Sequence, residues 1–378
     1  MSQQSDIYKI AIKLLPHVGD IVAKRLISYC GSLEAVFKEK EKFLAKIPGI
    51  GTVVASSIAG NTKKKEIFNI AEKEVEFNLK FGIHTVFFLD ENYPRRLIHC
   101  EDSPVTIFTL GNLELNHQKV LCVVGTRKAT IYGKDFCRKL MSDFKEMHLD
   151  VQIISGLAVG IDIAAHKAAI ENNFNTIAVL AHGLDTIYPA FHRKYAKQII
   201  ENGGLLTEFL TNTTPDKQNF IKRNRIIAGL ADAALVVESG LKGGALITAD
   251  IANSYNRDVY AVPGRISDSS SLGTNYLIKT NRAALAESAY DIANFLGWET
   301  KSRTAPVQSS FFTDFEPDEL TIAQQLEMQG DLTIDVLSLL CKMPVSKISA
   351  TLLGMEFKGI VKCLPGKVFQ LCVSLPKS

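Results

Sequence analysis

Six short apolar segments alternate with helix-like stretches between residues 119 and 262 of this 378-residue chain. They are 120–124, 151–155, 176–181, 205–208, 234–238 and 258–262. Each is a nearly continuous run of apolar residues, which is typical of strands buried on both faces of a parallel sheet. Helical connections between such strands predict an α/β fold with a Rossmann-like, doubly wound, mostly parallel sheet. A ligand site is then expected at the carboxyl ends of the strands.

The first 80 residues show the apolar spacing of short helices. Two similar phrases, at 15–20 and 47–52, each carry a proline and a glycine ahead of an apolar-periodic run. A glycine that opens a helix exposes backbone N–H groups that can hold phosphate oxygens, so this pair predicts a helix-hairpin-helix module. The same glycines can also serve as plain turns between helices, and the sequence leaves that alternative open.

The C-terminal part of the chain predicts a separate module. Residues 299–318 are rich in Ser, Thr and Pro without apolar period, which indicates a linker. Residues 319–378 suggest three short helices closed by a hairpin, the pattern of a winged helix. Acidic and basic residues are equally frequent over 301–378, which favours protein contact over DNA reading. The predicted domains are 1–80 (helical), 81–298 (core), 299–318 (linker) and 319–378 (winged helix).

Composition limits the class of protein. The content of 46% hydrophobic and 22% charged residues is that of a soluble globular protein. The polar N-terminus has no signal-peptide pattern, and the chain has no uninterrupted apolar run of about 18 residues, so a cytoplasmic protein without membrane association is expected. Its seven cysteines form no C-x-x-C pair, which favours reduced thiols. A net charge of +3 permits nucleic acid as a partner without requiring it.

Small-residue loops follow the predicted strands. They lie at 125–127, 155–162, 182–185 and 243–248. Such loops at one sheet edge form a concavity whose backbone N–H groups bind anions, and phosphate is the expected ligand. The glycine spacing matches neither the dinucleotide fingerprint nor the P-loop, so no nucleotide cofactor is expected.

The densest chemical signal is the basic stretch 217–225. It holds four cations, Lys217, Lys222, Arg223 and Arg225, around the aromatic Phe220. Single-stranded nucleic acid requires cations for its phosphates and an aromatic face for a base, so this stretch predicts a single-strand site. The alternative is a solvated helix start with Phe220 buried. Arg127, after the first core strand, could approach the same edge and clamp a phosphate with its guanidinium.

No catalytic machinery is evident. Asp162 and His166 share a helix face but have no third partner at metal-ligand spacing, so capping and packing are the preferred roles. His182 and His192 likewise lack partners. Ser155 follows a strand without an adjacent base, and no G-x-S-x-G elbow occurs. We therefore expect no catalytic residue, no metal and no enzymatic activity.

The ordered motifs resemble those of the DNA-processing protein A family, known as DprA or Smf. They span about 90–295 of the sequence. The motifs are Val124-Gly125-Thr126-Arg127, Ser155 to Asp162 with His166, Gly183-Leu184-Asp185 with Tyr188-Pro189, Thr207-Glu208-Phe209, Phe220 to Leu230, Ala261 to Gly264 and Gly273-Thr274-Asn275. Departures from the family pattern, such as Thr126, Ile221 and His192, remove no charge.

This resemblance implies a homodimeric core that binds and protects single-stranded DNA and loads RecA recombinase on incoming DNA during natural transformation. Single-strand-binding protein is a further expected partner. The implied DNA contacts are Arg127, Lys217 and Phe220, with Arg223 and Arg225 lining the same pocket. Neighbouring positions complete the candidate DNA-binding set: Gly125, Thr126, Ser155, Gly156, Lys222, Asn224, Gly243, Gly244 and Asn275.

Two other functions compete with this interpretation. Gly243 and Gly244 are similar to a loop of nucleotide phosphoribohydrolases of the lysine-decarboxylase-like type. Their P-G-G-x-G-T-x-x-E signature is not met, because Lys242 precedes the glycines and Ala245 follows. The other alternative is an interaction scaffold in which the terminal modules do the recruiting. Ribose release from nucleoside monophosphates would distinguish the enzyme, and salt-independent binding would favour the scaffold.

Overall fold

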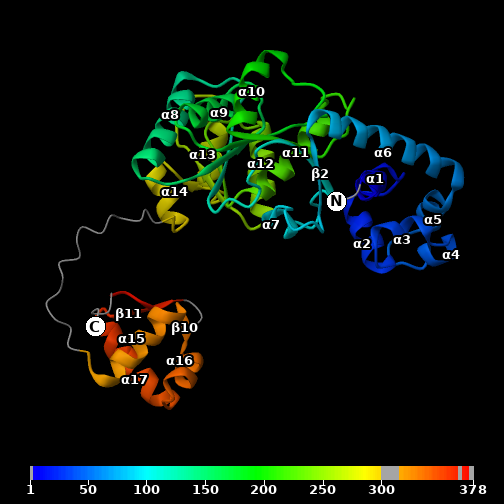
Figure 1. Cartoon of the computed structure of the whole chain (residues 1–378). Helices are drawn as coiled ribbons and strands as arrows, with labels where there is room; N and C mark the ends of the chain where they lie inside the picture. Colours follow the sequence, from blue (N-terminus) through cyan, green and yellow to red (C-terminus); the bar gives the residue numbers. More distant parts are fainter. Residues whose placement is uncertain (1–2, 299–314, 365–367, 374–378) are drawn as a thin grey trace. The chain divides into compact units, whose positions relative to one another are not determined.

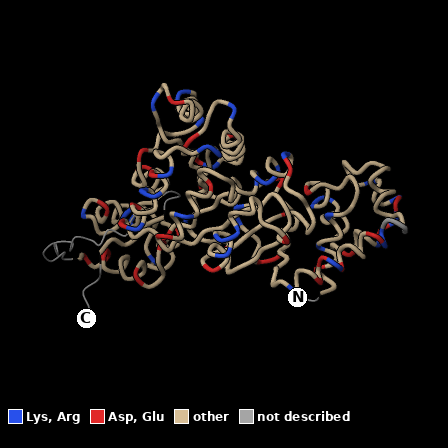
Figure 2. Tube along the Cα trace, turned by 90° about the horizontal axis from the view of Figure 1, so that it is seen from above, with Lys and Arg blue, Asp and Glu red and all other residues tan. Residues whose placement is uncertain are grey.

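The computed structural model describes residues 3–298, 315–364 and 368–373 (Figure 1). The chain divides into two compact units, residues 1–301 and residues 302–378. Along the trace, Lys and Arg alternate with Asp and Glu over most elements (Figure 2). The predicted linker at 299–318 falls largely on 299–314, outside the described residues, and the predicted domain boundaries stay predictions.

The described part of the first unit forms one nine-stranded sheet in the order β1-β2-β6-β5-β4-β3-β7-β8-β9. All neighbours from β6 to β9 along this order are parallel, and β2 pairs antiparallel with both β1 and β6. The strands are β1 His84–Phe87, β2 Thr106–Gly111, β3 Val120–Val124, β4 Gln152–Ser155, β5 Thr176–Val179, β6 Gly203–Thr207, β7 Ala233–Val236, β8 Asp258–Ala261 and β9 Ala284–Leu285. The predicted doubly wound, mostly parallel sheet is confirmed, and β1, β2 and β9 lie outside the six predicted strands.

Helices cover both faces of the sheet (Figure 1). One face packs against α7 Arg95–Ile98, α11 Lys217–Leu230, α12 Gly244–Ser254 and α13 Leu272–Lys279. The other face packs against α8 Ile131–Glu146, α9 Ile161–Glu171, α10 Arg193–Glu201 and α14 Ala289–Phe295. This two-sided cover explains why the strands are nearly continuous apolar runs rather than alternating ones.

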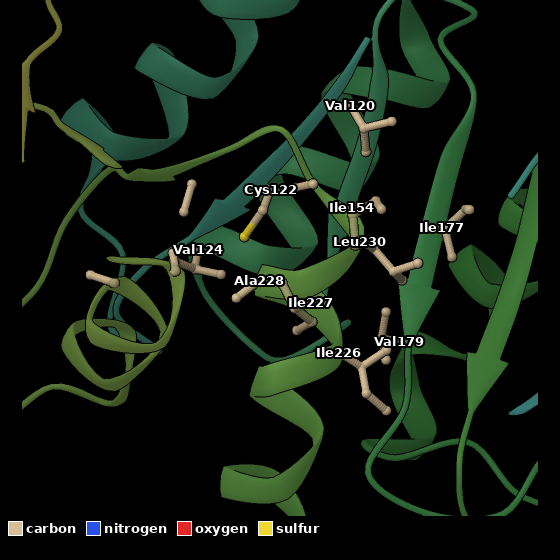
Figure 3. Packing of buried hydrophobic residues seen from close by; sticks show 14 of the residues in the cluster. Val120, Cys122, Val124, Ile154, Ile177, Val179, Ile226, Ile227, Ala228 and Leu230 are labelled. Atoms are coloured by element: carbon tan, nitrogen blue, oxygen red, sulfur yellow. The ribbon is translucent and has the colours of Figure 1, made fainter. Parts of the chain in front are cut away.

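Strand β3 shows how the sequence builds this double core. Its even-numbered residues Val120, Cys122 and Val124 point to the side of α11, where they pack with Ile226 and Ile227 (Figure 3). Its odd-numbered residues pack on α8 and α9 instead. Burial of each such aliphatic side chain stabilises the fold by roughly 1.5 to 3 kcal/mol, so α11 is held firmly on its apolar side.

The direction of winding reverses beside β3. The chain moves from β3 outward through β4, β5 and β6, then crosses back to place β7 on the other side of β3. The connection that crosses back contains α11. At such a switch point the loops after the two central strands separate and leave a crevice at the carboxyl ends. The candidate site is therefore expected above β3 and β7.

The N-terminal helices of the first unit contain the two predicted hairpins. Gly19 precedes α2 and Gly51 precedes α5, each in an extended conformation at the N-cap. Gly49 has φ +79°, a left-handed conformation that favours glycine. The helices are α1 Gln3–Ala11, α2 Asp20–Cys30, α3 Leu33–Lys38, α4 Glu41–Leu44, α5 Thr52–Ala59 and α6 Asn61–Phe81. The predicted helix-hairpin-helix arrangement is confirmed.

The second unit has the predicted winged-helix order. Its elements are α15 Pro317–Gln329, β10 Leu332–Thr333, α16 Ile334–Cys341, α17 Val345–Phe357, β11 Val361–Leu364 and β12 Val368–Leu371. The strands β10, β12 and β11 form a small antiparallel sheet over an apolar core. Of the helices in the described ranges, none alone is long and apolar enough to cross a membrane, and α16 with α17 reaches that limit only as a pair bent by 110°.

His166 of α9 lies fully buried beneath the sheet edge. Its Nδ1 is 2.7 Å from the Thr176 hydroxyl oxygen, and its Nε2 has no hydrogen-bond partner. Burial is the main reason that the pKa of His166 falls to about 3, and the charges of His192 and Arg223 act in the same direction. The imidazole is therefore a neutral packing group in the folded protein.

Substitution of His166 by Gln should flatten the dependence of stability on pH. Between pH 6.5 and the folded pKa of about 3, His166 is protonated in the unfolded chain and neutral in the folded chain. The free energy of unfolding therefore falls as pH decreases, by about 1.4 kcal/mol per pH unit from this group, and His166→Gln removes that part of the slope. Urea unfolding followed by the fluorescence of Trp298, the single tryptophan, measures it. Equal slopes in the variant and in the exposed control His84→Gln would contradict the assignment.

Candidate functional site

A groove of about 610 Å³ lies at the carboxyl ends of β3 and β7. Its walls come from the loop after β3, the first two turns of α11 and the loop that opens α12. Nine of the fourteen candidate residues from the sequence line it: Gly125, Thr126, Arg127, Lys217, Phe220, Arg223, Asn224, Gly243 and Gly244. The fold thus brings together segments that are up to about 120 residues apart, as expected for loops at a switch point.

Helix α11 presents one side to the groove. Asp216 caps it, because its carboxylate accepts a hydrogen bond of 2.8 Å from the Asn219 N–H. Lys217, Phe220 and Asn224 follow at helical spacing, so they share a face one above the other. Lys217 is exposed in the first turn, where its charge is not neutralised by any ion pair among the described residues.

The Phe220 ring lies partly open at the wall of the groove. The guanidinium carbons of Arg127 and Arg223 are 5.1 Å and 5.7 Å from its centroid. The Tyr188 ring lies 6.1 Å away at 55°. Two cation–π contacts fix the ring while leaving aromatic surface accessible. Phe220 is therefore neither the fully buried side chain of the alternative interpretation nor an isolated surface ring.

The loop of Arg127 is held by backbone bonds rather than by its own side chain. Thr126 donates its N–H to the Glu238 carbonyl at 2.7 Å, and its carbonyl accepts the Ile161 N–H at 3.2 Å. The close approach depends on Gly160, which has φ +93° and whose Cβ, if present, would lie 2.1 Å from the Thr126 oxygen. The backbone of this loop is thus held in place, and the Arg127 guanidinium remains available to a ligand.

Arg223 points away from solvent into the base of the groove. It is only 3% exposed, and its guanidinium donates to the carbonyls of Gly156, at 2.7 Å, and of Val179. Burial lowers the pKa of Arg223 to about 10, and the neighbouring Asp162 opposes that change, so the side chain stays charged at neutral pH. Burial likewise raises the pKa of Asp162, while Arg223 lowers it. The Arg223 guanidinium and the two carbonyls that it bonds form a buried brace beneath the groove.

Arg225 does not line the groove, which corrects the sequence expectation. Its guanidinium contacts Glu208 at 2.5 Å and Asp20 at 3.2 Å, and it also donates to the Asp102 carbonyl. Two positions along an α-helix rotate a side chain by about 200°, so Arg223 and Arg225 leave α11 on opposite sides. Arg225 connects α11 to the N-terminal helix α2.

Four further candidates also lie away from the groove lining. Ser155 is fully buried and donates its hydroxyl to the Val123 carbonyl at 2.6 Å, so that hydroxyl is already engaged. Gly156 is buried under Arg223, where a Cβ would lie 2.5 Å from the guanidinium. Asn275 holds the Gly264 backbone through both of its amide atoms. Lys222 is exposed on α11 but lies outside the lining.

The two histidines His182 and His192 contact backbone carbonyls of the loops near the sheet edge. His182 and His192 each place Nδ1 2.8 Å from a backbone carbonyl, those of Gly183 and Leu157. Burial lowers the pKa of both rings. Within residues 3–298, 315–364 and 368–373, no group of three or more His, Cys, Asp or Glu side chains is arranged to hold a metal ion. The side chains of the groove can bind anions and stack on a planar ring.

Four polar or charged lining residues were not among the sequence candidates: Asp162, Asp216, Lys242 and Thr248. Lys242 directly precedes Gly243, and a cation beside a glycine-opened helix was the available signal. Asp162 was interpreted as a cap or packing residue, since its partner Arg223 is 61 positions away in sequence. Only the fold brings these two charges together.

Comparisons with known proteins point to one family. A family model described as DNA recombination-mediator protein A matches residues 84–297. A helix-hairpin-helix motif matches residues 13–69, and a DprA winged helix domain matches residues 304–367.

Individual relatives give the same result. Protein Smf of Escherichia coli is 36% identical over 291 residues, which cover 74% of this chain and 75% of that protein. The X-ray structure of DNA processing protein A from Streptococcus pneumoniae covers 78% of this chain and 98% of its own, with a TM-score of 0.64 and 30% identity. A Helicobacter pylori structure, described by its single-stranded DNA binding mode, covers 58% of this chain and 98% of its own, with a TM-score of 0.52 and 28% identity.

Replacement of Arg223 by Met should destabilise the first unit by roughly 1 to 3 kcal/mol, because it leaves the buried carbonyls of Gly156 and Val179 without the donors that Arg223 supplies. Urea unfolding followed by Trp298 fluorescence measures the decrease in stability. Lys222→Met, on the same helix but exposed, is the matched control and should change stability by less than about 0.5 kcal/mol. A similar small effect for Arg223→Met would show that the buried brace is not structural.

Proposed function

The chain belongs to the DNA recombination-mediator protein A family, and from this premise we propose that it binds single-stranded DNA in the groove above β3 and β7. The observation that carries the proposal is the convergence of Arg127, Lys217 and Phe220 on one groove from two distant segments. Cations supply the phosphate contacts and the aromatic ring supplies a stacking platform, which together define single-strand sites. The description of the Helicobacter pylori relative by its single-stranded DNA binding mode supports the same assignment.

The opposite wall of the groove supports phosphate binding as well. Helix α12 begins at Gly244 with Gly243 as its N-cap, and a Cβ placed at Gly244 would meet nothing within 4 Å. Its first N–H groups are therefore accessible to a phosphate oxygen, and Lys242 adds a charge beside them. A DNA strand between α11 and α12 is then bound through its phosphates and by stacking of a base on the aromatic ring. Both kinds of contact tolerate any base sequence.

The finer role is proposed from membership of the same family. In this proposal the chain acts in the cytoplasm as a homodimer, protects incoming single strands and loads RecA recombinase on them in the presence of single-strand-binding protein. It binds DNA without altering it covalently: the groove offers cations and an aromatic ring, while Asp162 is buried against Arg223. Natural transformation is the process that supplies such strands.

Removal of the groove side chains should weaken binding to oligothymidine. Lys217→Ala combined with Phe220→Ala removes one phosphate partner and one stacked base, the latter alone being worth about 1 to 3 kcal/mol. Arg127→Ala removes a second phosphate partner. Each cation that a variant removes from the strand should lower the slope of log affinity against log salt by about 0.7. Fluorescence anisotropy of the full chain at several salt concentrations measures both affinity and slope.

The matched control for these variants is Lys222→Ala, which removes the same charge from α11 outside the groove lining. It should leave affinity almost unchanged. If Arg127→Ala and the Lys217/Phe220 variant both bind as tightly as the natural chain, with unfolding curves intact, the groove is not the DNA site.

RecA loading has a separate readout. Filament assembly by RecA on strands coated with single-strand-binding protein should be faster with the natural chain present than without it. The Arg127→Ala variant should lose most of this acceleration, because the chain must hold the strand that it delivers. Absence of acceleration by a chain that still binds single strands would refute loading while leaving DNA binding in place.

A further inference from the structure

A second cavity, of about 460 Å³, lies between α8 and α9 beside the groove. These two helices run side by side on the face of the sheet opposite α11 (Figure 1). Five cations line the cavity: Arg127, Lys128, Lys134, Arg138 and Lys167. The family motifs and the groove account for Arg127 alone, so the proposed function gives the other four no role.

The charge of this cavity is only partly compensated locally. Glu171 is the one acid in its lining, and Arg138 pairs with the exposed Asp135. Within the described ranges, the side chains of Arg127, Lys128 and Lys134 make no ion pair. Concentrated like charges repel one another unless an anion binds between them, so the cavity favours a polyanionic ligand.

The floor of the cavity is apolar. Val159 is 42% exposed there and Ala164 of α9 is partly exposed, while Ile163 and Ala168 of the lining are buried. An inorganic anion gains nothing from such a floor, whereas a nucleotide places phosphate on a cationic rim and its base on apolar surface. The combination therefore selects a nucleic-acid segment over a simple salt ion.

Arg127 connects the cavity to the groove, because it lines both. We propose that the α8–α9 cavity holds the next segment of the same DNA strand after it leaves the groove over Arg127. Lys134 and Lys167 contact its phosphates from the two helices, and the apolar floor supports a base. This inference rests on the proposed groove function and extends the binding site past the positions that the family motifs mark.

The test compares strand lengths with the full chain. Oligothymidines of about 6 and about 20 nucleotides, each with and without a 5′-phosphate, are titrated by fluorescence anisotropy. Lys134→Ala combined with Lys167→Ala should weaken the longer strand about tenfold and lower its salt slope by about 1.4, while the shorter strand, held by the groove, binds as before. Lys139→Ala with Lys145→Ala, on exposed positions of α8 outside the cavity, removes the same charge and should change neither length.

Each outcome decides the question. If the affinity for both strand lengths falls equally, or if the Lys139/Lys145 control has an equal effect, the cations act only through the general positive charge of the surface. Either result overturns the proposed site in the cavity. An unchanged affinity for the longer strand also overturns it, as does a weakening seen only with a 5′-phosphorylated strand, which identifies an end-phosphate site instead. If the natural chain binds neither length, the groove proposal itself fails.

Lys167 also contacts the Tyr195 ring, with its Nζ 4.3 Å from the centroid, so its removal could disturb packing. Lys134→Glu is the second variant, because Lys134 is exposed in the first turn of α8 and no described ion pair holds it. It should weaken the longer strand by more than the alanine pair does. Binding of the longer strand at natural affinity by a normally folded Lys134→Glu chain would refute the proposal.

Discussion

The buried guanidinium of Arg223 is the contact on which the candidate site depends. It joins α11 to the Gly156 carbonyl after β4 and to the Val179 carbonyl at the end of β5, with Asp162 as its nearest countercharge. A charge in that position is costly unless every donor finds an acceptor, so the three segments must meet in one arrangement. The orientation of Phe220 and Lys217 on the open side of the same helix follows from it.

The sequence was sufficient for the six strands β3 to β8, because apolar runs report burial directly. It was insufficient for the arginines, since Arg223 and Arg225 contribute equally to charge density although they leave α11 on opposite sides. Helical spacing could have separated them, because Phe220 and Asn224 share a face that Arg225 does not. The strand β2 pairs antiparallel with β6, about 100 residues away, and such distant pairing has no local signal.

Two buried acids and two exposed cations lie around the groove. Asp162 and Glu238 are buried, where they face Arg223 and the Thr130 backbone, and each is at most 7% exposed. Arg127 and Lys217 are left at the surface, where no described ion pair links them to an acid. These two carboxylates thus face inward, and at the surface of the groove the exposed acid Asp216, the N-cap of α11, lies among the exposed cations Arg127, Lys217 and Lys242. Arg127 lines both the groove and the α8–α9 cavity, so the positive charges of the two concavities adjoin one another.

The attachment of α11 on two opposite sides limits how a chain of this kind can vary in length. An added residue between Lys217 and Arg223 would turn the later part of the helix by about 100° relative to the earlier part. Either the groove side chains or both arginines would then lose their partners. The segment 209–216 ahead of the helix contains no regular element and can absorb such a change. Insertions and deletions should therefore collect in that loop and be excluded from α11.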